Sequence, residues 1–186
     1  LDRLRRDFPD LLLVLVPRHP ARAPEVTRAA LERGLTLTAR SSAEPVRPET
    51  DVFLGDTLGE MGLFYRLAPV TFLGGSFVDV GGHNPVEAAL AGSALITGPR
   101  VANARGVYKD FWTRGAAVRV SEPGDLADSV GALLKDTGRL TGQVATARSL
   151  VEAGRGALEK TLELLKRVLN DAGKGRHAEP EDEKST

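Results

Sequence analysis

Cysteine is absent from this 186-residue sequence, and aromatic residues make up only 5% of it. The lack of cysteine excludes disulfide bonds, thiolate zinc sites and cysteine nucleophiles. Basic and acidic residues number 25 each, so the formal net charge is +0, and the positive surface of a general nucleic-acid or anionic-membrane binder is missing. The longest apolar run, Leu11 to Pro17, is far shorter than the ~18 residues of a membrane span. These absences predict a soluble chain with a local recognition site and no nucleic-acid partner.

The residues that are present have the composition of a folded domain. Hydrophobic residues make up 41% of the chain and charged residues 27%, which is enough for one full core. The chain opens at Leu1 without an initiator Met, so we expect it to be part of a longer protein whose missing portion lies upstream.

Apolar, β-rich runs alternate with helical patterns, which is typical of βαβ units that build a parallel sheet. Several runs are apolar throughout, as expected where helices cover both faces of a sheet. The sequence therefore predicts an α/β fold with a doubly wound, parallel, six-stranded Rossmann-like sheet. The predicted strands are Leu11–Val16, Leu35–Ala39, Asp51–Gly55, Val70–Gly74, Ala94–Gly98 and Ala116–Val120. The predicted helices are Ala23–Arg33, Leu58–Ala68, Pro85–Ala91, Ala104–Thr113, Pro123–Asp136, Gly138–Ala153 and Ala157–Asn170.

Polar and glycine-rich segments follow these strands, where a doubly wound sheet binds its ligand. Arg18 follows the first strand between two prolines, and GGSFVDVGGHNPVE follows the fourth. Thr57 with Glu60, and Asn84 with Glu87, have the spacing of capping boxes at helix starts. Free amides at helix starts suit a phosphate, and glutamates at the rim accept hydrogen bonds from sugar hydroxyls. The pattern indicates a site for an anionic, hydroxyl-rich ligand such as a sugar nucleotide.

Other catalytic classes have little support in the sequence. The motifs GxGxxG, GxxxxGK[ST] and GxSxG do not occur, which disfavours dinucleotide dehydrogenases, P-loop NTPases and serine hydrolases. The three histidines, His19, His83 and His177, form no ligand-spaced cluster with carboxylates, so we expect no metal site.

Several residues keep a structural alternative. Capping alone explains Glu60 equally well. It explains Glu87 less well, because the glycine pairs upstream let the backbone approach a ligand closely. Asp56 and Asp79 have the position of acid/base groups, but turn-forming aspartates account for them as well. The aromatic residues in 108–112 are at helical spacing, which is typical of a packed core.

The motifs VPRHPAR, DTLGEMGLFY, FLGGSFVDVGGHNPVEAA and the GP with Asn103 together resemble the carboxyl-terminal half of bacterial 3-deoxy-D-manno-octulosonic acid (Kdo) transferases. The resemblance runs from about Leu11 to Val120, and GGHNP followed by Glu is specific within glycosyltransferases of the GT-B fold. The sequence departs from the family at Ala21, Leu58 and Ala88, where Glu, Met and Pro are usual. The resemblance implies the donor half of an inverting, metal-independent enzyme that moves Kdo from CMP-Kdo to a lipid A precursor in lipopolysaccharide biosynthesis.

Carried onto this sequence, the resemblance implies a CMP site at the ends of three strands. Its residues are Pro17, Arg18, Leu58, Gly59, Glu60, Asn84, Pro85, Val86 and Glu87. A second set, expected at the phosphate loop or the Kdo group, comprises Gly75, Ser76, Gly81, Gly82, His83 and Arg105. No catalytic residue is expected here, because the family's carboxylate base belongs to an amino-terminal half that this chain lacks.

The resemblance also implies the partners and the domain organisation. The donor is CMP-Kdo, with no cofactor or metal, and the missing half provides the contacts with the lipid A precursor and the membrane. The full enzyme is expected at the cytoplasmic face of the bacterial inner membrane. Residues 1–155 are expected to form the donor domain and 171–186 a disordered tail. The helix at 156–170 carries a leucine stripe, and it either docks on the missing domain or packs on the donor domain of this chain.

Two alternative functions remain open at this point. One is the donor domain of another GT-B glycosyltransferase, or a sugar-nucleotide epimerase, that uses a UDP-sugar. The other is a non-catalytic nucleotide-binding module. Binding of CMP, UMP and UDP discriminates among them, because a UDP enzyme binds the diphosphate best.

Overall fold

The computed structural model describes the backbone of residues 1–174, and the side chains of these residues except 155, 157–160 and 170–174. The chain forms two compact units, residues 1–148 and 149–186. The boundary lies inside the last helix, seven residues before the predicted domain boundary at residue 155. In the described part, no helix combines the length and the apolar character that crossing a membrane requires.

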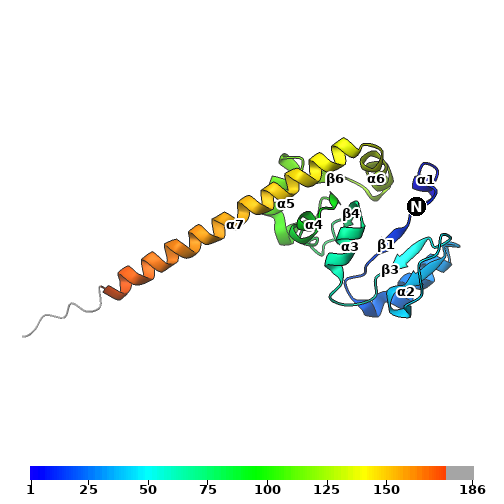
Figure 1. Cartoon of the computed structure of the whole chain (residues 1–186), viewed down its shortest axis with the longest axis horizontal. Coiled ribbons are helices and arrows are strands. Elements are labelled where there is room, and N and C mark those ends of the chain that lie inside the picture. The colour runs from blue at the N-terminus through cyan, green and yellow to red at the C-terminus, as the bar shows by residue number, and fades with distance from the viewer. Residues whose placement is uncertain (175–186) are drawn as a thin grey trace, which may run out of the picture. The chain divides into compact units, whose positions relative to one another are not determined.

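All six predicted strands are present, each shorter than predicted, and every strand pair is parallel (Figure 1). Their bounds are β1 Leu13–Leu15, β2 Leu37–Ala39, β3 Val52–Leu54, β4 Val70–Leu73, β5 Ala94–Thr97 and β6 Val118–Arg119. The strands form two three-stranded sheets, in the orders β1-β3-β2 and β4-β5-β6. The prediction of one six-stranded sheet is therefore corrected, because β1 and β4 exchange no ladder hydrogen bonds. Each of these two strands has a ladder partner on one side only within the described residues.

The helices lie where the sequence predicts them, with two differences: the short helix α1 is additional, and the two predicted final helices are joined. Their bounds are α1 Asp2–Arg5, α2 Ala23–Leu31, α3 Met61–Leu67, α4 Val86–Ala91, α5 Arg105–Thr113, α6 Leu126–Lys135 and α7 Thr137–Lys174. The two predicted final helices form the single helix α7, because Gly154 and Gly156 between them do not interrupt it. A glycine inside a helix costs about 1 kcal/mol relative to alanine, which neighbouring turns can tolerate. Helix α7 enters the segment predicted to be disordered, and residues 175–186 lie outside the described residues.

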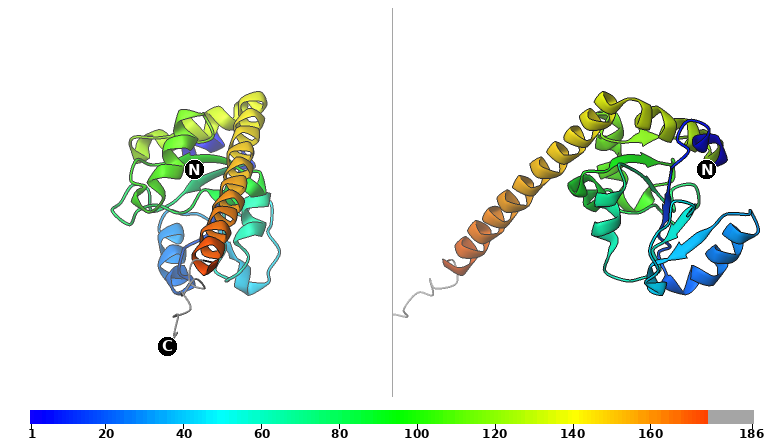
Figure 2. Two further views of the ribbon diagram at one scale, coloured as in Figure 1. Left: turned by 90° about the vertical axis from the view of Figure 1, so that its left-hand side faces the viewer. Right: turned by 45° about the vertical axis from the view of Figure 1, so that its right-hand side comes forward.

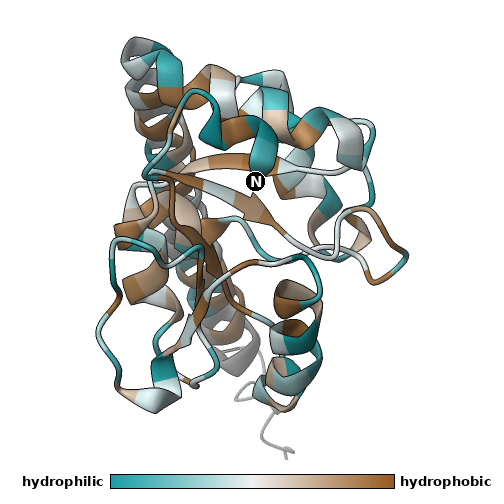
Figure 3. Cartoon of the chain, turned by 90° about the vertical axis from the view of Figure 1, so that its right-hand side faces the viewer, coloured by the Kyte–Doolittle hydropathy of each residue, from teal (hydrophilic) through white to brown (hydrophobic). Residues whose placement is uncertain are grey.

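Each sheet packs against its own helices in the first unit. Strands β2 and β3 contact α2, whereas β4 and β5 contact α6 (Figure 2). The core between the β4-β5-β6 sheet and its helices contains the nearly or fully buried residues Ile96, Val120 and Leu133. In the group around the β1-β3-β2 sheet, Leu54 is fully buried and Phe64 packs edge-on against Phe53. Hydrophobic residues are accordingly concentrated in the strands (Figure 3).

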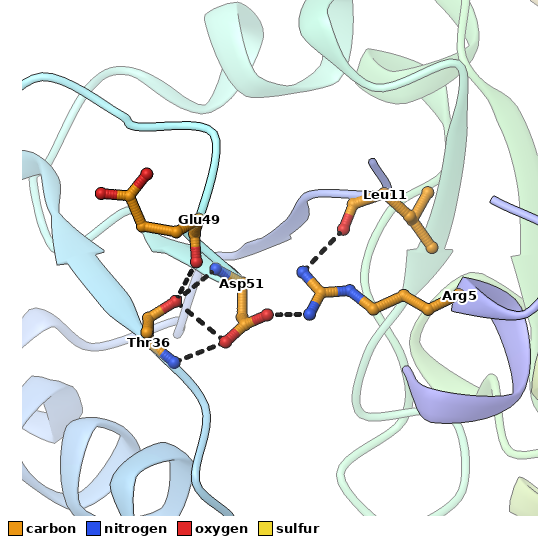
Figure 4. Close-up of polar contacts among 5 residues, drawn as sticks. All are labelled: Arg5, Leu11, Thr36, Glu49 and Asp51. Carbon is orange, nitrogen blue, oxygen red and sulfur yellow. Dashed lines mark hydrogen bonds and ion pairs between the residues drawn. The ribbon is translucent and has the colours of Figure 1, made fainter. Parts of the chain in front are cut away.

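Helix α1 makes polar contacts with both groups. Arg5 forms an ion pair with Asp51, which precedes β3, and Arg5 Nη2 donates a hydrogen bond to the carbonyl of Leu11 (3.2 Å; Figure 4). The same Asp51 carboxylate accepts a hydrogen bond from the amide of Thr36 (2.6 Å). On the other side, Arg3 pairs with Asp128 of α6 (2.5 Å). The contacts of α1 therefore lie near the amino-terminal end of β3, opposite the strand ends predicted to bind the ligand.

Candidate functional site

The loop after β1 and the loop after β4 come close enough for their charged groups to interact. Arg18, after β1, is exposed and makes no ion pair within the described residues. His83 lies in the loop between β4 and α4 and is half-buried. Burial of the imidazole, and secondly the charge of Arg18, lowers the pKa of His83 below its usual value. The loops after β1 and β4 therefore carry an exposed cation and a half-buried imidazole whose charges influence each other.

Glu87 lies in the first turn of α4, which packs against α3, the helix that contains Tyr65. Its side chain is exposed and makes no hydrogen bond within the described residues. Burial, and secondly the negative charge of Glu87, raises the pKa of Tyr65. Sequence reasoning did not select Tyr65 as a site residue. The only signal for it was its place at the end of the motif DTLGEMGLFY.

Glu60 is held by two side chains and does not form the predicted capping box. Helix α3 begins at Met61, so Glu60 is its N-cap residue, not the third residue of the helix. The Thr57 hydroxyl donates directly to the Glu60 carboxylate, and Arg40 Nη2 lies 2.9 Å from it. Hydrogen bonds from Thr57 and Arg40 lower the pKa of Glu60. Arg40 was missed because it is twenty residues away in the sequence, and no local pattern connects the two.

The predicted capping box at Asn84 and Glu87 is not formed, because Pro85 is the N-cap residue of α4. The oxygen Oδ1 of Asn84 instead accepts a hydrogen bond from the amide of Val86 (3.0 Å), the first residue of the helix. The reciprocal bond from Glu87 is missing among the described contacts, which leaves its carboxylate available to a ligand. Pro85 is buried beneath this turn.

The loop between β4 and α4 depends on glycine at several positions. Gly75, Gly81 and Gly82 all have positive φ, which favours glycine strongly. A Cβ atom at Gly81 would lie 2.5 Å from the side chain of Asn103, so this position also has no room for one. Ser76 is fully buried, and its hydroxyl donates to the carbonyl of Leu73 (2.7 Å). We therefore do not propose Ser76 as a ligand contact.

The remaining candidates lie at the margin of this arrangement. Asp79 forms an ion pair with Arg100. Burial acts to raise the pKa of Asp56, but hydrogen bonds from the hydroxyl and amide of Ser41 hold it below its usual value. Arg105 is the exposed first residue of α5. Within residues 1–174, no three His, Asp or Glu side chains are grouped as metal ligands.

A groove of about 530 Å³ lies elsewhere, between α2 and the ends of β2 and β3. Its lining includes Leu31, Ala39, Leu54 and Asp56, and none of the residues predicted to bind CMP. The groove is therefore distinct from the loops that contain Arg18 and His83.

Comparison with known proteins is consistent with this arrangement. No protein-family model matches the chain. The chain is 39% identical over 163 residues to the 3-deoxy-D-manno-octulosonic acid transferase of Bordetella pertussis, and 34% identical over 163 residues to that of Haemophilus influenzae. Each match covers 87% of this chain but only 38% of the relative. The chain thus spans well under half the length of these curated relatives.

A solved structure resembles the fold. The carboxyl-terminal CMP-Kdo binding domain of WaaA from Acinetobacter baumannii superposes with a TM-score of 0.75 at 28% sequence identity, over 80% of each chain. The two parallel sheets and their helices therefore match the carboxyl-terminal domain of a GT-B protein. We conclude that the chain belongs to the 3-deoxy-D-manno-octulosonic acid transferase family and corresponds to its carboxyl-terminal domain.

Proposed function

We propose that this chain is the donor-binding domain of a Kdo transferase and binds CMP-Kdo. The observation that carries the proposal is that Arg18 and His83 follow two different strands, β1 and β4, and that the charge of Arg18 acts on the imidazole of His83. Ligands bind at this edge in doubly wound folds. The similarity to a solved CMP-Kdo binding domain supports the same ligand.

The phosphate of CMP would lie between Arg18 and the loop that contains His83. Arg18 is exposed and has no protein counter-ion among the described residues, so its charge is free for an anionic ligand. The imidazole of His83 provides one donor, and the amides of Gly81, His83 and Asn84, which are free within the described residues, provide more. Such preorganised donors stabilise the charge that develops on a leaving phosphate without reorganisation.

The ribose and base would lie toward Glu87 and the segment Leu58–Glu60. The free carboxylate of Glu87 suits ribose hydroxyls, which need an acceptor. Glu60 already holds Arg40 and Thr57, so we propose that the segment around Leu58 and Gly59 contributes mainly backbone contacts. Arg105 is a weaker candidate for the Kdo carboxylate, since an exposed arginine at a helix start needs no ligand to explain it.

In the full-length enzyme, a hydroxyl of the lipid A precursor would attack the anomeric carbon of Kdo. The bond from that carbon to the phosphate oxygen breaks, and CMP leaves with the electron pair. The hydroxyl proton passes to a carboxylate base outside this chain. We propose that this reaction takes place at the cytoplasmic face of the bacterial inner membrane, where the remaining part of the enzyme contacts acceptor and lipid.

Calorimetric titration with CMP, UMP, UDP and cytidine tests the proposal. We expect CMP to bind best and the isolated chain to transfer no Kdo from CMP-Kdo to a lipid A precursor. Tightest binding of UDP would instead assign a UDP-sugar enzyme. Measurable Kdo transfer by the 186-residue chain would contradict the assignment of the catalytic base to another domain.

A further inference from the structure

The segment between β5 and α5 supports the base of the glycine-rich loop. The amide of Gly98 donates to the hydroxyl of Ser76, and the amide of Arg100 donates to the carbonyl of Ser76, both at 2.8 Å. A Cβ atom at Gly98 would lie 2.4 Å from that carbonyl oxygen, so the close approach requires glycine. The position of the loop therefore depends on residues that follow the next strand.

Asn103 and Tyr108 contact the upper part of the same loop. Asn103 Nδ2 donates to the carbonyls of Val80 (3.0 Å) and Gly82 (3.3 Å). The Asn103 amide donates to the carbonyl of Gly81 (3.0 Å), and the Tyr108 hydroxyl donates to that of His83 (2.5 Å). Four consecutive loop carbonyls thus accept hydrogen bonds from this one segment.

This pattern fixes the direction of the loop amides. All peptide bonds are trans, so the N–H of each residue points away from the preceding carbonyl. The amides of Gly81, His83 and Asn84 therefore face away from Asn103 and Tyr108. Within the described residues, these three amides donate to no protein acceptor. Free backbone amides that point to one side of a loop with left-handed glycines form a concave site for an anion.

We propose that Asn103 is a positioning residue for the phosphate of the donor. Its amide nitrogen holds the carbonyls of Val80 and Gly82 on one side, and so presents the amides of Gly81 and His83 on the other. The proposal rests on the proposed binding of CMP. Asn103 is not among the residues expected at the CMP site. It makes no contact with the ligand itself and acts only by holding the loop.

The substitution Asn103→Asp tests this directly, because aspartate keeps the shape but replaces both donors with an acceptor. Ala102→Asp is the matched control, since it adds the same charge at the neighbouring exposed position. We expect Asn103→Asp to weaken CMP binding about tenfold or more by calorimetry, with cytidine binding and the melting temperature close to those of Ala102→Asp. Exchange of the Gly82 amide, which donates to the carbonyl of Gly75 in the intact loop, should also accelerate in the free protein.

The outcomes separate the inference from the function on which it rests. If Asn103→Asp binds CMP as well as Ala102→Asp does, or loses CMP and cytidine affinity equally, Asn103 does not position the phosphate. If the unmodified protein binds no CMP, the proposed function itself fails and this inference falls with it. Should Asn103→Asp not fold, Tyr108→Phe removes only the hydroxyl that holds His83. It should then weaken CMP several-fold and leave cytidine unchanged, and equal affinity for CMP would overturn the proposal.

Discussion

Removing the Arg18 side chain gives the sharpest test of the proposed phosphate site. Arg18 is exposed and unpaired within the described residues, so Arg18→Ala removes no contact that stabilises the fold. A charge-assisted hydrogen bond to phosphate contributes about 1.5–3 kcal/mol, so CMP binding should weaken about ten- to hundredfold. Cytidine lacks the phosphate, and its affinity should hardly change. Calorimetric titration of both ligands measures the difference.

Arg22→Ala is the matched control for this experiment. Arg22 is four residues away, carries the same charge, and is paired with Glu25 at 2.8 Å. Its loss should leave CMP affinity nearly unchanged. A second readout is the pKa of His83 by NMR, which should rise in Arg18→Ala because the nearby positive charge is removed. Equal losses for CMP and cytidine, or equal effects of the two substitutions, would refute the placement of Arg18 at the phosphate.

Four further predictions follow from the same structure. Glu87→Gln should lower CMP affinity in calorimetry without changing the melting temperature, whereas unchanged affinity would show that Glu87 does not contact the ligand. The lowered pKa of His83 means that the unfolded chain binds more protons, so the melting temperature should fall as the pH drops below 6.5. His83→Asn should reduce that fall. Identical profiles of melting temperature against pH in the two proteins would show that His83 does not cause it. Truncation at Gly156 should leave the first unit folded, because its boundary is at Arg148, and a drop in melting temperature above ~10 °C would show otherwise. Leu13 is 39% exposed on β1, which has a ladder partner on one side only within the described residues, and such an edge favours self-association. Leu13→Lys should therefore reduce self-association, measured as concentration-dependent light scattering. Unchanged scattering would exclude the β1 edge as the contact between molecules.

The elements of the fold were predictable because each has a local signal. The apolar runs located all six strands, and the polar ends of β1 and β4 located Arg18 and His83. The arrangement of strands was not predictable, since LLLVLV carries no information about its neighbours. Continuity of α7 was also missed, because a glycine lowers helix stability without ending the helix.

In the candidate site, pairing over long sequence distances was the part that sequence reasoning could not reach. Glu60 was predicted from its local motif, but its partner Arg40 follows another strand. Tyr108 was correctly predicted as a core residue from the helical spacing of the aromatic residues, and it is fully buried. Its hydroxyl nevertheless holds the carbonyl of His83, and only the three-dimensional arrangement shows that contact.

The division into two sheets has a consequence for how the first unit folds. One sheet is built entirely from residues 13–54 and the other from 70–119, so no strand has to pair with a partner from the far end of the chain. Short sequence separations speed folding, and each sheet with its helices can gain structure before the other. Amide exchange under increasing denaturant should then resolve two sets of strand amides with different opening free energies. Helix α1, which holds Asp51 on one side and Asp128 on the other, couples these two cooperative units in the native state.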